Sequence, residues 1–142
     1  MNYPKGYYDT TPVKRRNKEL VEMFLEAYNL MRRKKMPNAK AKAIHWVVYN
    51  GRPRYHVGYI RTHVALCVMA QGGKPCKEGT STYAMWQELA ARVSAMQHAL
   101  GISRTKAIYY VLEHCRASRF FITEHTASLI IDDWLKTHKH RY

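Results

Sequence analysis

The sequence has few cysteines, few acidic residues and no long apolar run. Its 142 residues include three cysteines, an odd number without framework spacing, so a disulfide-rich secreted domain is not expected. The first residues are polar and tyrosine-rich, which does not fit a secretory signal peptide. The longest apolar run, 64–70, is far shorter than the roughly 20 residues of a membrane span. We therefore expect a protein that is not secreted and does not enter a membrane.

Patterns for catalysis and for metal or cofactor binding are also lacking. The 8 histidines and 3 cysteines do not show the tight ligand spacing of metal sites, such as Cys-x-x-Cys. Cys67 and Cys115 fall on apolar stripes, where a cysteine is usually a small buried hydrophobe. The Asp132-Asp133 pair has no partner for acid–base work, and no phosphate-binding glycine loop is present. The sequence thus predicts a protein that is not an enzyme, with no metal and no cofactor.

Positive charge is what the chain has in excess. Lys and Arg number 24 against 10 Asp and Glu, which gives a formal net charge of +14. Residues 1–70 hold 14 basic and 4 acidic side chains, whereas residues 71–142 hold 10 and 6. A polyanion is the natural partner of such a surface, because neutralised phosphates release their counterions. Alternatively, the charges are merely solvated by water, or the run 32–35 complements a helix dipole.

Apolar periodicity predicts an all-α fold of about six helices. Leu20, Phe24, Ala27, Tyr28 and Met31 form one amphipathic stripe, which indicates a helix over 17–35. Capping and stop signals set the ends of the others. They predict a second helix after Asn38 that ends near 50–51, a third over 58–70, a fourth over 83–100 that ends at Gly101, a fifth capped by Ser103 that reaches Cys115, and a sixth capped by Thr123.

The two halves of the sequence resemble each other. Lys42-Ala-Ile-His-Trp-Val-Val48 matches Lys106-Ala-Ile-Tyr-Tyr-Val-Leu112, and Arg54-Tyr-His-Val-Gly58 matches Arg119-Phe-Phe-Ile-Thr123. We interpret this as a tandem repeat of two three-helix units, each with a short extended bridge before its third helix. The predicted organisation is an N-terminal arm (1–13), a strongly basic first repeat (14–70), a linker (71–82), a second repeat (83–137) and a basic tail (138–142).

The two bridges are predicted to be scaffold. In each extended stretch, apolar residues alternate with residues expected to be more exposed. The apolar residues that should enter the cores are Tyr55, Val57, Phe120 and Ile122. Arg54 and Arg119 could then donate to the carbonyls that end the preceding helix, or they could bind phosphate instead.

A resemblance rests on 100–111 and on Ser118-Arg-Phe-Phe-Ile-Thr-Glu-His-Thr-Ala127. These residues resemble small uncharacterised helical proteins of Bacteroidales genomes, phages and mobile elements, with the pattern Pro-x-[Arg/Glu]-[Phe/Tyr]-[Tyr/Trp]-Val-[Ser/Thr] before a helix. The first half carries the pattern through Pro53, Arg54, Tyr55, Val57 and the early helix residue Ala65, with Gly58 in place of the hydroxyl cap. Ser118 replaces the proline in the second half. The similarity covers about 35 residues of each half. It implies a phage or mobile-element context, and it supplies no catalytic residue.

The candidate nucleic-acid contacts combine cations with aromatic side chains, which suit phosphate binding and stacking. They are Arg15, Arg16, Arg32, Arg33, Lys34, Lys35, Lys40, Lys42, Trp46, Tyr49, Arg52, Arg54, Lys106 and Tyr109. The turn at 100–103 also fits a helix-turn-helix that presents Lys106 and Tyr109 to a major groove. Alternatively, the aromatic residues pack against the neighbouring repeat.

Three functions remain open from the sequence. The chain binds DNA or RNA through the phosphate backbone, or it is a structural protein of a phage particle that packs against other virion proteins or copies of itself. A role in ribosome-associated or other RNA assembly fits the charge equally well. The corresponding locations are the bacterial host cytoplasm and the virion.

Overall fold

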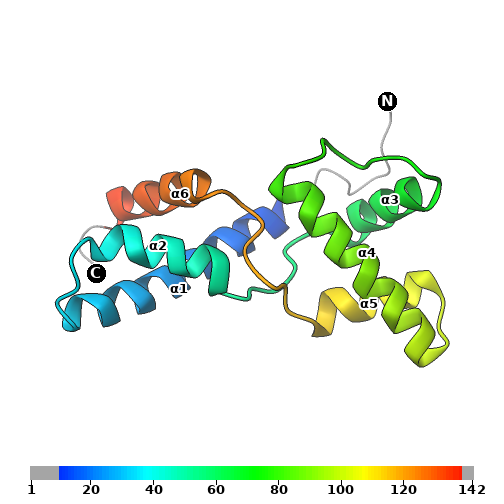
Figure 1. Ribbon diagram of the computed structural model, residues 1–142, viewed down its shortest axis with the longest axis horizontal. Helices are drawn as coiled ribbons and strands as arrows, with labels where there is room; N and C mark the ends of the chain where they lie inside the picture. The colour runs from blue at the N-terminus through cyan, green and yellow to red at the C-terminus, as the bar shows by residue number, and fades with distance from the viewer. Residues whose placement is uncertain (1–9, 139–142) are drawn as a thin grey trace. The chain divides into compact units, whose positions relative to one another are not determined.

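The computed structural model describes residues 10–138, and over that part of the chain it consists of six α-helices and no strand (Figure 1). The helices are α1 (Thr11–Arg33), α2 (Ala39–Asn50), α3 (Tyr59–Ala70), α4 (Ser81–Leu100), α5 (Arg104–His114) and α6 (Glu124–Thr137). The predicted all-α class and the number of helices are confirmed.

Short polar side chains begin three of the helices. The hydroxyls of Thr80, Ser103 and Thr123 accept the backbone N–H three residues on, at 3.1, 3.2 and 3.1 Å. Gly101 ends α4 in the left-handed conformation, with φ +63°. The caps at Ser103 and Thr123 and the stop at Gly101 were predicted. Because the cap of α4 is Thr80, this helix begins at Ser81, two residues before its predicted start.

Other predicted details of the helix ends differ from the structure, and the first helix is Thr11–Arg33 and not 17–35. Thr11–Val13, assigned to the arm, belong to α1, because a proline is tolerated in the first turn of a helix. Asn38 is the residue before α2, but it has φ +53° and its side chain makes no capping bond. Cys115 follows α5 as its C-cap and is not part of the helix. The rest of the predicted arm (1–9) and most of the tail (139–142) lie outside the described residues.

One compact unit contains α1, α2 and α6. It comprises 14–53 and 117–138 among the described residues, and we call it the α1–α2–α6 unit. The predicted stripe on α1 faces its core, and α2 and α6 lie side by side (Figure 1). The side chains that cluster in its core are Leu20, Phe24, Ala27, Ala43, Ile44, Val47, Val48, Phe120, Ile122, Ala127 and Ile131.

The second unit, which we call the α3–α4–α5 unit, comprises 10–13 and 54–116 among the described residues. Each of its three helices packs against the other two. Leu66 on α3, Trp86 and Leu89 on α4, and Ile108 and Val111 on α5 are buried in it. The chain therefore has two three-helix units, but they are not the two halves of the sequence.

The third helices of the two halves are exchanged. Helix α3 follows α2 in the sequence but packs against α4 and α5, whereas α6 follows α5 but packs against α2. The segments 14–70 and 83–137 are thus not compact units on their own. The duplication itself stays a prediction, and an exchange of this kind is compatible with it, because equivalent helices of two repeats present similar apolar faces.

Phe120 holds the connection to α6 in the α1–α2–α6 unit. Its ring is 1% exposed, and its N–H donates to the carbonyl of Val48 near the end of α2 (3.0 Å). Gly51 leaves the space for that ring: a Cβ on Gly51 would lie 2.8 Å from a ring carbon of Phe120 and 2.5 Å from the carbonyl oxygen of Val47. Any other residue at position 51 would therefore displace the ring.

The bridge residues are buried largely as predicted. Tyr55, Phe120 and Ile122 are buried, while Val57 is partly exposed. The hydroxyl of Tyr55 donates to Glu88, and the pKa of Tyr55 is raised well above its usual value, first because burial disfavours the phenolate and then because Glu88 is adjacent. Tyr55 is thus neutral in the folded protein.

The contacts of the two bridge arginines differ from the predicted ones. Arg54 donates to the carbonyl of Glu113 in the last turn of α5, because its bridge belongs to the α3–α4–α5 unit. Arg119 donates to the carbonyls of Phe120 and Ile122 in its own bridge, at 2.9 and 3.1 Å. Arg54 therefore contacts the end of a helix, as predicted, but that helix is α5 and not the preceding α2.

Truncation of Phe120 tests the scaffold role of the second bridge. We expect Phe120→Ala to lower the free energy of unfolding by about 3–5 kcal/mol, because a fully buried ring is lost and a cavity is left. Chemical denaturation measures the change. Phe121→Ala is the matched control, since Phe121 is partly exposed and should cost much less. Equal losses for the two variants would contradict a buried scaffold role for Phe120.

The exchange of third helices predicts fragment complementation. A chain divided between Gly73 and Lys74 gives a first fragment whose α3 lacks α4 and α5, and a second whose α6 lacks α2. We expect neither fragment to melt cooperatively alone, and an equimolar mixture to regain a cooperative transition measured by circular dichroism. A monomeric fragment that melts cooperatively, with no change on mixing, would show that each half folds by itself.

Candidate nucleic-acid interface

The four cations at the end of α1 lie in a helix-terminating motif. Arg32 and Arg33 are the last residues of α1. The N–H of Met36 donates to the carbonyl of Met31 (3.1 Å) and that of Lys35 to the carbonyl of Arg32 (2.9 Å). These two bonds define a Schellman motif, in which the left-handed position is usually a glycine. Here Lys35 occupies it, with φ +54°.

Two of these cations also serve the helix. The Nε of Arg33 donates to the carbonyl of Asn29 (3.4 Å), and the Arg32 guanidinium lies 5.3 Å from the centre of the Tyr28 ring. Cations at this end complement the helix dipole, as one interpretation of the sequence predicts. Arg32, Arg33, Lys34 and Lys35 are nevertheless all exposed. The structural role thus leaves their charge accessible to solvent.

Arg52 is a second exposed cation in the left-handed conformation. It has φ +49° and lies between Gly51, which must be small, and Pro53, which is buried. A left-handed backbone costs an ordinary residue about 1–2 kcal/mol. Within residues 10–138, three non-glycine residues have positive φ: Lys35, Asn38 and Arg52. Asparagine tolerates this conformation, so the two basic residues are the unusual ones.

The outer face of α2 presents aromatic side chains next to a cation. Lys42 and His45 are exposed, Trp46 is 48% exposed and Tyr49 is 42% exposed. These residues lie opposite the buried stripe of the helix and are substantially exposed. The Arg119 guanidinium lies 4.5 Å from the centre of the Tyr49 ring. Sequence reasoning assigned Arg119 to the helix end and missed this contact.

Two more predicted cations of the same unit are less accessible to a ligand. Lys40 forms an ion pair with Asp132 at 2.6 Å. Arg16 is partly buried, burial lowers its pKa, and its guanidinium donates to Asn17 Oδ1 at 2.9 Å. Arg15, next to it, is exposed. Lys40 and Arg16 are therefore weaker candidates for phosphate contact than the end of α1.

The remaining predicted residues lie in the α3–α4–α5 unit. Arg54 is engaged with Glu113, while Lys106 and Tyr109 lie on the exposed face of α5. The Tyr109 ring packs edge-on against Tyr59 at 5.9 Å. Eleven of the fourteen predicted residues thus belong to the α1–α2–α6 unit and three to the α3–α4–α5 unit.

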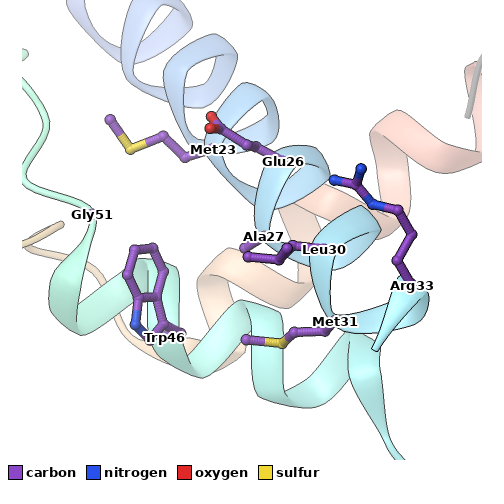
Figure 2. Close-up of a pocket in the computed structure, with 8 residues that line it drawn as sticks. All are labelled: Met23, Glu26, Ala27, Leu30, Met31, Arg33, Trp46 and Gly51. Atoms are coloured by element: carbon purple, nitrogen blue, oxygen red, sulfur yellow. The ribbon is translucent and has the colours of Figure 1, made fainter. Parts of the chain in front are cut away.

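A pocket between α1 and α2 was not predicted. It has a volume of about 560 Å³ and is lined mainly by apolar side chains. Figure 2 shows Trp46 on α2 facing Met23, Ala27 and Leu30 on α1, with Arg33 farther along α1 at its end. The lining residues are Met23, Glu26, Ala27, Leu30, Met31, Arg33, Trp46 and Gly51. The apolar periodicity predicted that Ala27 and Met31 face the core. The sequence did not indicate that an open pocket lies next to Ala27.

The histidines and cysteines are dispersed. Over residues 10–138, no group of three His, Cys, Asp or Glu side chains is close enough to hold a metal ion. His45 Nδ1 lies 2.6 Å from Glu124 Oε1, and Cys67 Sγ lies 3.8 Å from His63 Nε2 and 3.1 Å from the Arg104 guanidinium. Among the described residues, no helix is long and apolar enough to cross a membrane.

Comparison with known proteins adds no assignment. No protein-family model, no curated protein and no solved structure matches the chain. The function is therefore inferred from the residues and their geometry.

Proposed function

We propose that this protein binds nucleic acid, mainly through the phosphate backbone, with the α1–α2–α6 unit. Lys14–Pro53 carries 11 Lys and Arg residues against 3 Glu. Most of these cations are exposed, and those at 32–35 are consecutive. A phosphate backbone can engage several of them together and release the counterions that each phosphate holds. We place this activity in the cytoplasm of a bacterial host or in a phage particle.

The observation that carries the proposal is the backbone conformation of Lys35 and Arg52. Both are basic, both are exposed, and both hold a left-handed conformation that glycine would adopt without strain. Strain of this kind persists where the surrounding structure enforces it, and it clusters at functional sites. A requirement for positive charge at these two positions accounts for a lysine and an arginine where stability alone favours glycine.

Neutralising the end of α1 tests phosphate binding. We expect Arg32→Gln, Arg33→Gln, Lys34→Gln and Lys35→Gln together to weaken binding to all sequences alike. The slope of log affinity against log salt should fall by up to about three, because each lost phosphate contact removes about 0.7–0.9. Fluorescence anisotropy with duplex DNA, single strands and RNA over a salt series measures both effects.

A matched pair of variants separates local contacts from total charge. Lys34→Gln with Lys35→Gln removes two lysines from the proposed interface, and Lys74→Gln with Lys77→Gln removes two from the segment between α3 and α4. The first pair should weaken binding more than the second. Binding that ignores salt, or equal effects of the two pairs, would rule out this interface.

Glycine at position 35 should separate stability from binding. We expect Lys35→Gly to raise the free energy of unfolding by about 0.5–1 kcal/mol, because the left-handed strain is relieved, and to weaken nucleic-acid binding. Lys34→Gly removes one lysine charge at a position without positive φ. It relieves no strain, so it should lower the free energy of unfolding, and it should weaken nucleic-acid binding as much as Lys35→Gly does. Denaturation and anisotropy on both variants check this. If Lys35→Gly binds nucleic acid as tightly as the unaltered protein, positive charge at position 35 is not required for binding, and the proposed reason for the strain is wrong.

A structural role in a phage particle is the second candidate function. Leu30, Met36 and Leu129 are large apolar side chains that are substantially exposed, as the packing of neighbouring subunits or other copies of the chain would require. Mass spectrometry of purified particles distinguishes this role, since a structural subunit is recovered in fixed stoichiometry. A role in RNA assembly involves the same phosphate chemistry and predicts tighter binding to RNA than to DNA.

A further inference from the structure

The pocket beside Trp46 combines a flat aromatic wall with a cationic end. One side is the Trp46 indole, about half exposed; Met23 and Leu30 on α1 lie across from it, and Met31 lies beside it (Figure 2). Ala27 contributes only a methyl group at the centre, which leaves room between the two walls. A nucleobase is flat and apolar on its faces, so it can stack on an indole and contact aliphatic side chains with its other face.

Charge indicates that the occupant carries a phosphate. Arg33 lines one end of the pocket, and it is followed directly by Lys34 and Lys35. A nucleotide in a strand joins a stacking base to an anionic phosphate. A purely apolar ligand would not neutralise the positive charges of Arg33, Lys34 and Lys35. A base-paired duplex keeps its bases stacked inside the helix, so they could not stack on the indole. An unpaired nucleotide satisfies both features of the pocket.

Glu26 is the acidic residue in the lining of this pocket. Within residues 10–138 its carboxylate has no ion-pair partner. A carboxylate only accepts hydrogen bonds, so it favours base edges that carry donors. The guanine edge presents two adjacent donors, N1–H and the N2 amino group, which match the two oxygens of one carboxylate. Next to a phosphate the same carboxylate would be repulsive, so its place in the pocket favours contact with a base.

We infer that the groove between Trp46 and α1 binds an unpaired nucleobase of a single-stranded nucleic acid, with guanine preferred through Glu26. The inference rests on the proposed phosphate binding and adds to it the strand type and the base. Phosphates bound by Arg33, Lys34 and Lys35 position the strand, and the base enters the groove and stacks on Trp46.

The test compares oligonucleotides of equal length and equal phosphate number at one salt concentration. The probes are a single strand whose one guanine stands among abasic residues, the same strand with abasic residues throughout, and a duplex. We expect the guanine strand to bind about tenfold more tightly than the abasic strand, because stacking of one base on an aromatic side chain is worth about 1–3 kcal/mol. Substituting the guanine by adenine, cytosine or thymine should give intermediate affinities.

Three variants assign the effect to the groove. Trp46→Ala should remove the tenfold difference between the intact and the abasic strand, whereas Trp46→Phe should retain most of that difference. Glu26→Gln should abolish the guanine preference and keep the difference between intact and abasic strands. Tyr110→Ala is the matched control, because Tyr110 is a similarly exposed aromatic residue on α5 and should change nothing. Since Trp46 is half exposed, each variant is expected to fold.

The outcomes separate this inference from the proposed function. If the abasic strand binds as tightly as the intact one, or if Trp46→Ala leaves the difference intact, the base pocket is wrong while salt-dependent phosphate binding still stands. If no probe binds in a salt-dependent manner, the proposed function fails as well. Loss of binding to a purified particle protein in Trp46→Ala, with single-strand binding unchanged, would identify the groove as a protein-docking site and overturn the inference.

Discussion

The contact between Phe120 and Gly51 is the constraint on which the α1–α2–α6 unit depends. The chain leaves α2 at Gly51, and the absence of a side chain there allows the Phe120 ring to lie against the end of α2. The N–H of Phe120 donates to the carbonyl of Val48 and that of Ala117 to the carbonyl of Pro53, at 3.0 and 2.7 Å. A residue far along the sequence thereby satisfies acceptors at the end of α2 and directs α6 to the side of that helix.

Local signals predicted the helices well, and they did not predict which helices pack together. Ser103, Gly101 and Thr123 act through bonds to residues a few positions away, so they can be recognised without knowledge of the fold. Local signals do not indicate which other helix a given helix packs against. Ala65 on α3 and Ala127 on α6 are both buried on apolar faces, and periodicity indicates which face is buried but not against what. The exchange of third helices follows from long-range contacts such as that of Phe120.

The candidate interface could likewise be predicted only in part. Charge counts located the basic segment, and the helical period placed Lys42, Trp46 and Tyr49 on the exposed face of α2. The left-handed conformation of Lys35 could not be foreseen, because glycine or asparagine is the usual signal for that position and neither is present. The groove beside Trp46 depends on how far apart two helices lie, which the sequence pattern of neither helix records.

The exchanged helices and the basic surface are connected through the chain. The basic end of α1, Arg52 and the face of α2 come from the first half of the sequence, yet the core beneath them includes Phe120, Ile122, Ala127 and Ile131 from the second. The proposed interface is therefore maintained by residues that carry none of its charge. Because α6 contributes two fully buried side chains to this core, Ala127 and Ile131, its loss would expose the inner faces of α1 and α2 and release the geometry of the groove. The exchange of third helices thus makes a basic surface encoded in one half dependent on the other half of the chain.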